Sequence, residues 1–296
     1  MKNILLIGGT GFTGKHILKK LITSYSSVFN ISLFVRSKEK IHQLNLDTKA
    51  FNIFQGNLDD LNSLEKALHN QHIVIYVASL GFGHARALVK KLEMVAPEKV
   101  IFTSTTGIFT NLNPKSKSIR IDAEKIIRES KLNYTIIRPT MIYGKKDDRN
   151  ISRLINFIRK SPIIPVFGNG LFLQQPIYVE DLADAILSAA TTNKSNKKEY
   201  NVSGKSPVTY RELINIINKT IKTSTISIYI PKKLSLFIVS TFRKILPNFP
   251  IKEEQILRLN ENKNFNHSAA INDLNFTPLS VEEGIKKQLQ DMRLTS

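Results

Sequence analysis

Three glycines near the N-terminus have the spacing needed to bind a phosphate group. Gly8, Gly11 and Gly14 follow the apolar run Ile4–Ile7, and a helical pattern runs on from Lys15 to Leu21. In a strand–turn–helix unit, such glycines permit a tight turn, close approach to a pyrophosphate and close helix packing. The N–H groups at the helix start then hold the phosphates. The pattern predicts a dinucleotide site made of Gly8, Thr10, Gly11, Phe12, Thr13 and Gly14.

The residue after the second apolar run indicates which dinucleotide fits. Proteins that bind NAD usually place a carboxylate here, which accepts hydrogen bonds from the ribose hydroxyls. This chain has Arg36, followed by Ser37 and Lys38. Because a guanidinium pairs with a 2′-phosphate, Arg36 favours NADP as the cofactor and leaves NAD as the alternative. The other interpretation of Arg36 is a solvated charge at a strand end.

The glycine spacing resembles that of the short-chain dehydrogenase/reductase superfamily, in its extended or atypical branch. The motif Gly56-Asn57-Leu58-Asp59 resembles the family's stretch that contacts adenine, with Asn57 where the family has Asp. The amide oxygen of Asn57 can still accept a hydrogen bond. The resemblance also implies that Leu58 and Ala78 lie along the adenosine half of the cofactor.

Two further motifs extend the resemblance over nearly the whole chain. The run from Arg138 to Gly144 resembles the family's Arg-Pro-x-x-x-[Phe/Tyr]-Gly signature, which implies that Pro139 and Thr140 face the carboxamide end of the cofactor. The run 176–185 is the second motif. Relatives that bind nucleotide sugars often have Arg just before it, whereas this chain has Gln174 and Gln175.

The resemblance implies catalytic roles for Thr105, Ser104 and Arg120. In the family, the hydroxyl at the position of Thr105 bonds the substrate carbonyl or alcohol, although Thr is also simply common in strands. The family's Tyr-x-x-x-Lys pair precedes a helical glutamate, which is Glu124 here, so Ser116 occupies the tyrosine position and Arg120 the lysine position. A serine cannot replace the tyrosine directly as a proton donor, but Arg120 can hold the nicotinamide ribose.

Alternating strand and helix patterns position these residues. Continuous apolar runs predict strands at Ile4–Ile7, Ile31–Val35, Phe51–Phe54, Ile73–Val77, Val100–Thr103 and Tyr134–Ile137. Helices are predicted at Leu61–Leu68, Ala85–Val95 and Ile119–Glu129. The fold class is therefore α/β, a doubly wound parallel Rossmann sheet with a smaller C-terminal α+β domain. The expected domains are 1–202, with an insertion near 161–176, and 203–296.

Composition narrows the class of protein. The absence of cysteine excludes disulfides and thiolate metal sites, and the histidines have no metal-ligand spacing, so no metal is expected. The net charge of +19 is spread along the chain without a block of basic residues. A compositional bias therefore explains it better than a nucleic-acid partner. The first apolar run is too short for a signal peptide, so the expected location is the cytoplasm.

One apolar segment leaves two interpretations open. Leu234–Phe242 is flanked by Lys232, Lys233, Arg243 and Lys244. It is too short to span a bilayer, which needs about 20 apolar residues. It could make peripheral contact with an anionic membrane, but a buried helix is the favoured prediction.

The sequence therefore supports two classes of function. The first is an NAD(P)-dependent oxidoreductase, epimerase or dehydratase acting on a small molecule, a carbonyl or sugar-type substrate. The second is a non-catalytic NADP-binding accessory or assembly subunit, or a redox sensor, since the chain also resembles the accessory nucleotide-binding subunit of respiratory complex I. Ser116, Arg120 and Gln175 favour the second class. Oligomeric state has no signature in the sequence.

Overall fold

A parallel sheet forms the larger part of the computed structural model, which describes residues 1–44, 46–246 and 251–294. Within these residues the sheet has seven strands in the order β11-β6-β5-β4-β1-β2-β3. The strands are β1 (Lys2–Ile7), β2 (Phe29–Val35), β3 (Asn52–Gln55), β4 (Ile73–Tyr76), β5 (Lys99–Thr103), β6 (Tyr134–Pro139) and β11 (Lys198–Val202). The order reverses beside β1, which is the doubly wound arrangement predicted from the sequence.

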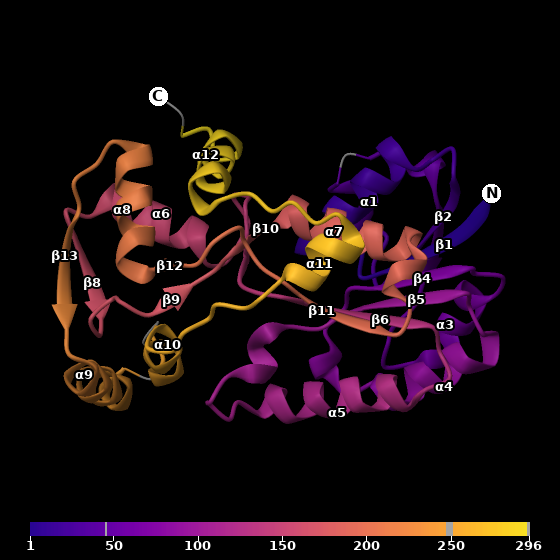
Figure 1. Ribbon diagram of the computed structural model, residues 1–296, viewed down its shortest axis with the longest axis horizontal. Helices are drawn as coiled ribbons and strands as arrows, with labels where there is room; N and C mark the ends of the chain where they lie inside the picture. The colour runs from indigo at the N-terminus through magenta and orange to yellow at the C-terminus, as the bar shows by residue number, and fades with distance from the viewer. Residues whose placement is uncertain (45, 247–250, 295–296) are drawn as a thin grey trace.

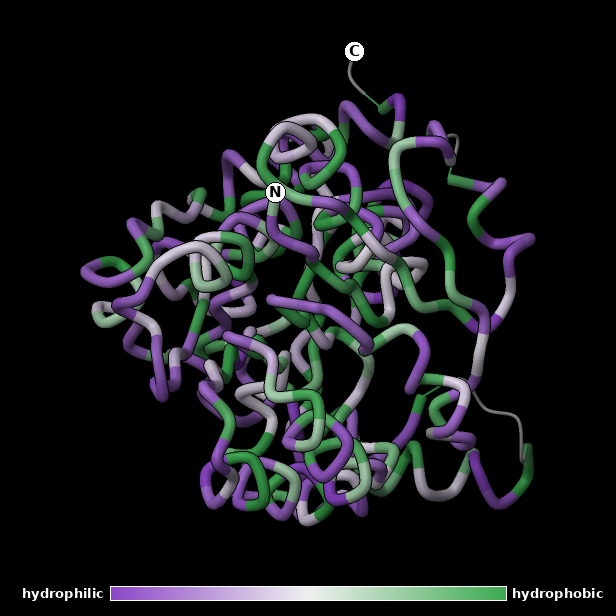
Figure 2. The backbone as a smooth tube through the Cα atoms, turned by 90° about the vertical axis from the view of Figure 1, so that its right-hand side faces the viewer, coloured by the Kyte–Doolittle hydropathy of each residue, from purple (hydrophilic) through white to green (hydrophobic). Residues whose placement is uncertain are grey.

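Helices cover both faces of this sheet (Figure 1). On one face lie α1 (Phe12–Ser24), α7 (Val179–Thr191) and α11 (Ser268–Leu274), and on the other α3 (Leu61–Leu68), α4 (Ala85–Val95) and α5 (Lys115–Glu129). A short α2 (Glu39–His42) follows β2. Each face has its own apolar core, which is why the central strands read as continuous apolar runs. In Figure 2, segments in green, the colour of apolar residues, run through the middle of the molecule.

The helices predicted at Leu61–Leu68 and Ala85–Val95 have the predicted bounds, but the third begins earlier than expected. Helix α5 starts at Lys115, after Pro114, rather than at Ile119. The apolar periodicity missed this first turn because residues 115–118 alternate Lys and Ser. Ser116 and Arg120 therefore lie one turn apart on the same helix.

A smaller unit packs at the end of the sheet (Figure 1). It contains α6 (Ile151–Lys160), β8 (Ile163–Phe167), α8 (Tyr210–Ile221), β13 (Ile226–Ile230), α9 (Lys232–Ile245), α10 (Glu253–Leu259) and α12 (Val281–Asp291). The strands β8 and β13 pair in parallel. Two pairs of two-residue strands complete the connections, β7 (Ile142–Tyr143) with β10 (Ile177–Tyr178) and β9 (Leu173–Gln174) with β12 (Val208–Thr209).

The chain crosses between the two units more than once. Residues 151–167, placed by the sequence in the first domain, share a core with α8 and α12. In the other direction, α11 returns from the second part of the chain to pack on α7 and β11. The boundary at residue 202 therefore stays a prediction about independent folding. Capping boxes at Thr209 and Ser280 begin α8 and α12.

The expected burial of Leu234–Phe242 is wrong. The segment is helical, as part of α9, but Phe237 is 69% exposed and Leu234 is 49% exposed. Ser235 and Val239 are the buried residues of this helix. The reason is its position, because α9 lies at the outer end of the smaller unit and packs against α10 rather than between two layers (Figure 1).

A buried ion pair joins α5 to the sheet. The carboxylate of Glu124 is fully buried and accepts bonds from Arg138 Nε at 2.9 Å and Nη2 at 2.6 Å. Arg128 and the hydroxyl of Ser104 also donate to it, at 2.9 and 2.6 Å. Burial alone would lower the pKa of Arg138, but Glu124 and Glu199 outweigh it and raise this pKa. Arg138 therefore stays charged inside the fold.

We expect Glu124→Gln to lower the free energy of unfolding by about 3 kcal/mol, because it leaves the buried charge of Arg138 less well compensated. Urea denaturation measures this change. The matched control is Glu129→Gln on the same helix, whose exposed pair with Lys125 spans 3.9 Å and should cost less than about 1 kcal/mol. Equal effects of the two substitutions would contradict a structural role for the buried pair.

Candidate functional site

The turn after β1 requires glycine at two positions. Gly8 has φ +92°, and a Cβ atom there would lie 3.0 Å from the backbone nitrogen of Ala78. A Cβ on Gly14 would lie 2.1 Å from the carbonyl oxygen of Gly8. Both contacts are with backbone, which cannot move aside as a side chain can. The glycines therefore let α1 pack directly behind β1.

This packing leaves the start of α1 able to bind an anion. Gly11 occupies the N-cap position, no side chain caps the helix, and its first turn has no acidic residue. The first N–H groups of a helix lack partners within the helix, and its dipole favours negative charge there. Phe12, Thr13 and Gly14 form this first turn, so their backbone N–H groups, rather than their side chains, suit a pyrophosphate.

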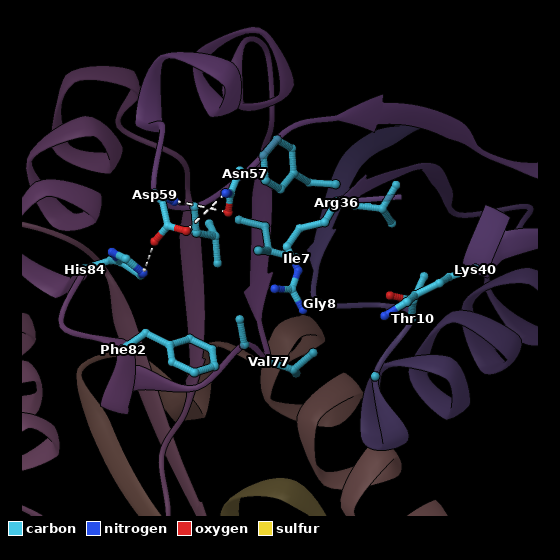
Figure 3. Close-up of a pocket in the computed structure, with 15 residues that line it drawn as sticks. Ile7, Gly8, Thr10, Arg36, Lys40, Asn57, Asp59, Val77, Phe82 and His84 are labelled. Carbon is cyan, nitrogen blue, oxygen red and sulfur yellow. Dashed lines mark hydrogen bonds and ion pairs between the residues drawn. The ribbon is translucent and has the colours of Figure 1, made fainter. Parts of the chain in front are cut away.

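A cavity of about 480 Å³ opens in front of this turn. Seven of the residues predicted to bind cofactor line it, namely Gly8, Thr10, Gly11, Arg36, Asn57, Leu58 and Ala78 (Figure 3). The volume is that of a small-molecule site. The cradle and the cavity together fit the adenosine and pyrophosphate parts of a dinucleotide.

Five polar or aromatic residues of this cavity were not predicted from the sequence. They are Phe34, Lys40, Asp59, Phe82 and His84. Lys40 lies in α2, four residues after Arg36, a spacing that was available in the sequence. In Figure 3 the guanidinium of Arg36 points into the cavity, and Lys40 lies beside Thr10. Two cations thus stand at one end of the cavity.

The opposite end of the cavity holds acceptors. Asp59 pairs with His84, with 3.3 Å between Oδ1 and Nε2. Its other oxygen accepts from the side-chain amide of Asn57 at 3.0 Å, and Asn57 Oδ1 in turn accepts from the backbone N–H of Asp59. Asn57 Oδ1 keeps a second lone pair, so both residues can accept a hydrogen bond from a ligand amino group.

A second cavity, of about 450 Å³, lies between the sheet and the smaller unit. Thr105 and Thr140 line this cavity rather than the first one. Thr105 Oγ1 accepts a bond from the backbone N–H of Gly107 at 3.1 Å. Because a hydroxyl has one proton to give as well as lone pairs, Thr105 retains its donor for a ligand.

Ser104 and Pro139 line neither cavity, although both were predicted as site residues. The hydroxyl of Ser104 donates to the buried carboxylate of Glu124. The carbonyl of Pro139 accepts a bond from Thr106 at 3.2 Å. Both residues therefore support the strand ends next to Thr105 rather than face a ligand.

Arg120 lies between the two cavities. Its guanidinium donates to Ser116 at 2.8 Å and reaches Ser79 at 3.5 Å, next to Ala78 of the first cavity. Burial, and then the charge of Arg258 in the second cavity, lower its pKa. The ribose contact expected for Arg120 stays a prediction. The hydroxyl of Ser116 accepts the hydrogen bond from Arg120, and Ser116 lines neither cavity.

Tyr143, which stands in the Arg-Pro signature, belongs to the core. It is buried beside Tyr178, and a Cβ on Gly284 would lie 1.9 Å from its hydroxyl oxygen. Burial raises its pKa far above the ordinary value. Tyr143 therefore cannot donate a proton to a ligand in either cavity.

Sequence reasoning missed Lys263 in the second cavity. Burial lowers the pKa of Lys263 to about 8, with the charge of Arg258 adding to the effect. Its ammonium lies 3.5 Å from Gln174 Oε1, and the Nε2 of that buried amide has no partner in residues 1–44, 46–246 and 251–294. Gln175 holds the segment in place, accepting from Phe265 N–H at 2.9 Å and donating to Gly204 at 2.7 Å. Nothing in the sequence pattern joins Lys263 to Thr105, because the two lie far apart along the chain.

The described part of the chain holds no cluster of His, Cys, Asp or Glu that could bind a metal ion. Among the same residues, no helix is both long enough and apolar enough to cross a bilayer.

A family model described as NAD(P)H-binding matches residues 8–193, which is more than half of the chain. The chain belongs to this NAD(P)H-binding family. It is 25% identical to a mitochondrial NADH dehydrogenase [ubiquinone] 1 alpha subcomplex subunit 9 of Dictyostelium discoideum, with 94% of this chain and 81% of that protein aligned. It is 23% identical to a UDP-N-acetyl-alpha-D-glucosaminuronate decarboxylase of Bacillus cytotoxicus, over 99% and 98% of the two chains.

Solved structures confirm the fold class. A UDP-glucuronic acid 4-epimerase from Bacillus cereus, in complex with UDP-glucuronic acid and NAD, matches with a TM-score of 0.77. The alignment covers 98% of this chain and 99% of that one, at 15% identity. The predicted α/β fold with a parallel Rossmann sheet is thus confirmed. The chain is an NAD(P)H-binding protein whose fold is similar to that of this epimerase.

Proposed function

We propose that this protein binds NADP(H) and uses it to reduce or oxidise a small carbonyl or sugar-type substrate. The observation that carries the proposal is the second cavity, which opens beside the hydroxyl of Thr105 and has room for a ligand. A purely structural nucleotide-binding subunit has no need for such a space. The proposal also includes a cytoplasmic location and no nucleic-acid partner.

The choice of NADP over NAD rests on charge. Arg36 and Lys40 line the same end of the first cavity, where the ribose 2′-position of a bound cofactor would lie. Two cations can neutralise a 2′-phosphate, whereas a carboxylate for the ribose hydroxyls of NAD is missing at position 36.

The residues of the second cavity support a route for the proton. The chemistry that NADPH would supply at this site is a hydride for a carbonyl carbon. Thr105 donates a hydrogen bond to the carbonyl oxygen, and the ammonium of Lys263 gives that oxygen its proton. A lysine with a pKa of about 8 is a suitable general acid near neutral pH. It would replace the missing tyrosine, which neither Ser116 nor Tyr143 can do.

A non-catalytic accessory subunit is the second candidate. Arg120 donates a hydrogen bond to Ser116 at the two positions where the family has its catalytic pair. One relative is an NADH dehydrogenase [ubiquinone] subunit. A panel of carbonyl compounds separates the two candidates. If none of them oxidises bound NADPH, the accessory role becomes the better conclusion.

We expect Arg36→Asp to weaken NADPH binding by about 1.5–3 kcal/mol, the value of a charged hydrogen bond, and to affect NADH much less. Fluorescence titration with both nucleotides at fixed salt measures this. Lys38→Asp is the matched control, since it makes the same change of charge on an exposed residue outside the cavity. A wild-type protein that prefers NADH would refute the assignment.

Thr105→Val should lower turnover by roughly 10²-fold or more while NADPH affinity stays nearly constant, because the hydroxyl would act on the substrate. Ser116→Ala should change turnover little. Steady-state kinetics with the best substrate of the panel gives both values. Loss of turnover in Ser116→Ala would show that the roles are assigned to the wrong residues.

The pH dependence of carbonyl reduction tests Lys263. The protonated amine is the active form, so kcat should be constant below pH 8 and fall as the pH rises through about 8. Lys263→Met should remove this dependence and lower kcat about 10²–10⁴-fold, without weakening NADPH binding. Lys286→Met, at an exposed lysine paired with Glu282, is the control. An unchanged pH profile in Lys263→Met would exclude the proposed proton donor.

A further inference from the structure

The exposed face of α9 is apolar along most of its length. Leu234 is 49% exposed, Phe237 69% and Ile245 71%. At 3.6 residues per turn these three side chains fall within an arc of about 80° on the helix surface. The buried Ser235 and Val239 lie on a different side, towards the rest of the unit. The apolar residues thus form a stripe that faces away from the core, with the exposed Thr241 between Phe237 and Ile245.

The strand before α9 also has exposed apolar residues. Ile226 and Ile228 of β13 are exposed, and β13 leads into α9 through Pro231 alone. Figure 1 shows β13 and α9 together at the outer end of the smaller unit. Exposed apolar residues that are clustered rather than scattered mark an interaction site.

The charged residues of α9 are all basic. Residues 232–245 contain four basic residues and no acidic one, and Arg243 pairs with Glu253 of the neighbouring α10. Two of them, Lys233 and Lys244, are exposed and lie beside Phe237 on the helix surface, at the border of the stripe. An apolar face bordered by lysines is the pattern of helices that lie in a membrane interface.

We propose that α9 docks this protein onto the surface of a bilayer containing anionic lipids, with Leu234, Phe237 and Ile245 inserted among the acyl chains. Lys233 and Lys244 then lie at the depth of the headgroups. The helix has 14 residues and would be about 21 Å long. It lies along the interface, since it is shorter than a membrane-spanning helix must be.

Charge argues against the alternative occupant, a second copy of this chain. An isologous dimer through the stripe would bring Lys233 and Lys244, at its border, close to the same two lysines of the other copy. Docking on an anionic surface removes this repulsion and gains attraction instead. The first cavity lies in the sheet unit, away from α9 (Figure 1), so a docked protein keeps its nucleotide site open to solution.

Flotation of the full chain with vesicles tests the proposal. The vesicles contain neutral lipid with about 30% phosphatidylserine, or neutral lipid alone, at about 0.15 M salt. Wild-type protein should float with the anionic vesicles and far less with the neutral ones. Phe237→Glu should lower the partition coefficient at least tenfold, because it removes the largest inserted side chain. Lys233→Ala and Lys244→Ala should each lower it roughly fivefold.

A matched control separates docking from general exposure of apolar residues. Met94 is 77% exposed on α4 of the sheet unit, so Met94→Glu makes the same kind of change elsewhere and should leave flotation unchanged. Near-UV circular dichroism and NADPH titration check that each variant is folded. Three results would overturn the proposal: no flotation of wild type, equal flotation of Phe237→Glu, or a wild-type dimer in sedimentation that Phe237→Glu dissociates.

Discussion

A buried carboxylate must be paired, and in this protein that constraint governs the edge of the sheet at which Thr105 lies. Glu124 is held by Arg138 of β6, by Arg128 of its own helix and by Ser104 at the end of β5. These bonds lock α5 against two neighbouring strands. Thr105, the next residue after Ser104, is thereby presented to the second cavity, and Arg120 projects one turn before Glu124 towards the first.

The two cavities divide the chemistry between the two units. The first is built from backbone close to glycine and from the ends of parallel strands, so it recognises what dinucleotides share. The second is closed by residues after 203, such as Tyr210, Arg258 and Lys263, so under the proposed function it would determine which substrate reacts. Burial lowers the pKa of Lys263 to about 8. In that proposal a residue of the smaller unit replaces the tyrosine that α5 lacks.

Local patterns predicted the sheet well for a physical reason. A strand buried on both faces must be apolar throughout. Residue 8 must be glycine, because a Cβ atom there would lie 3.0 Å from the backbone nitrogen of Ala78. Both constraints leave a signature in a few consecutive residues. Charge at the end of β2 is equally local. The first turn of α5 was missed because its alternating Lys and Ser residues have no apolar periodicity.

The amino-acid sequence by itself determined the Rossmann sheet, the phosphate turn and the cation at position 36. Only the tertiary structure decided three other features. Lys263 and Thr105 line the same cavity, Tyr143 is buried against Gly284, and Phe237 is exposed to solvent. The reason is that burial and proximity depend on which distant segments pack together. An apolar run such as Leu234–Phe242 has the same local pattern whether another layer covers it or none does.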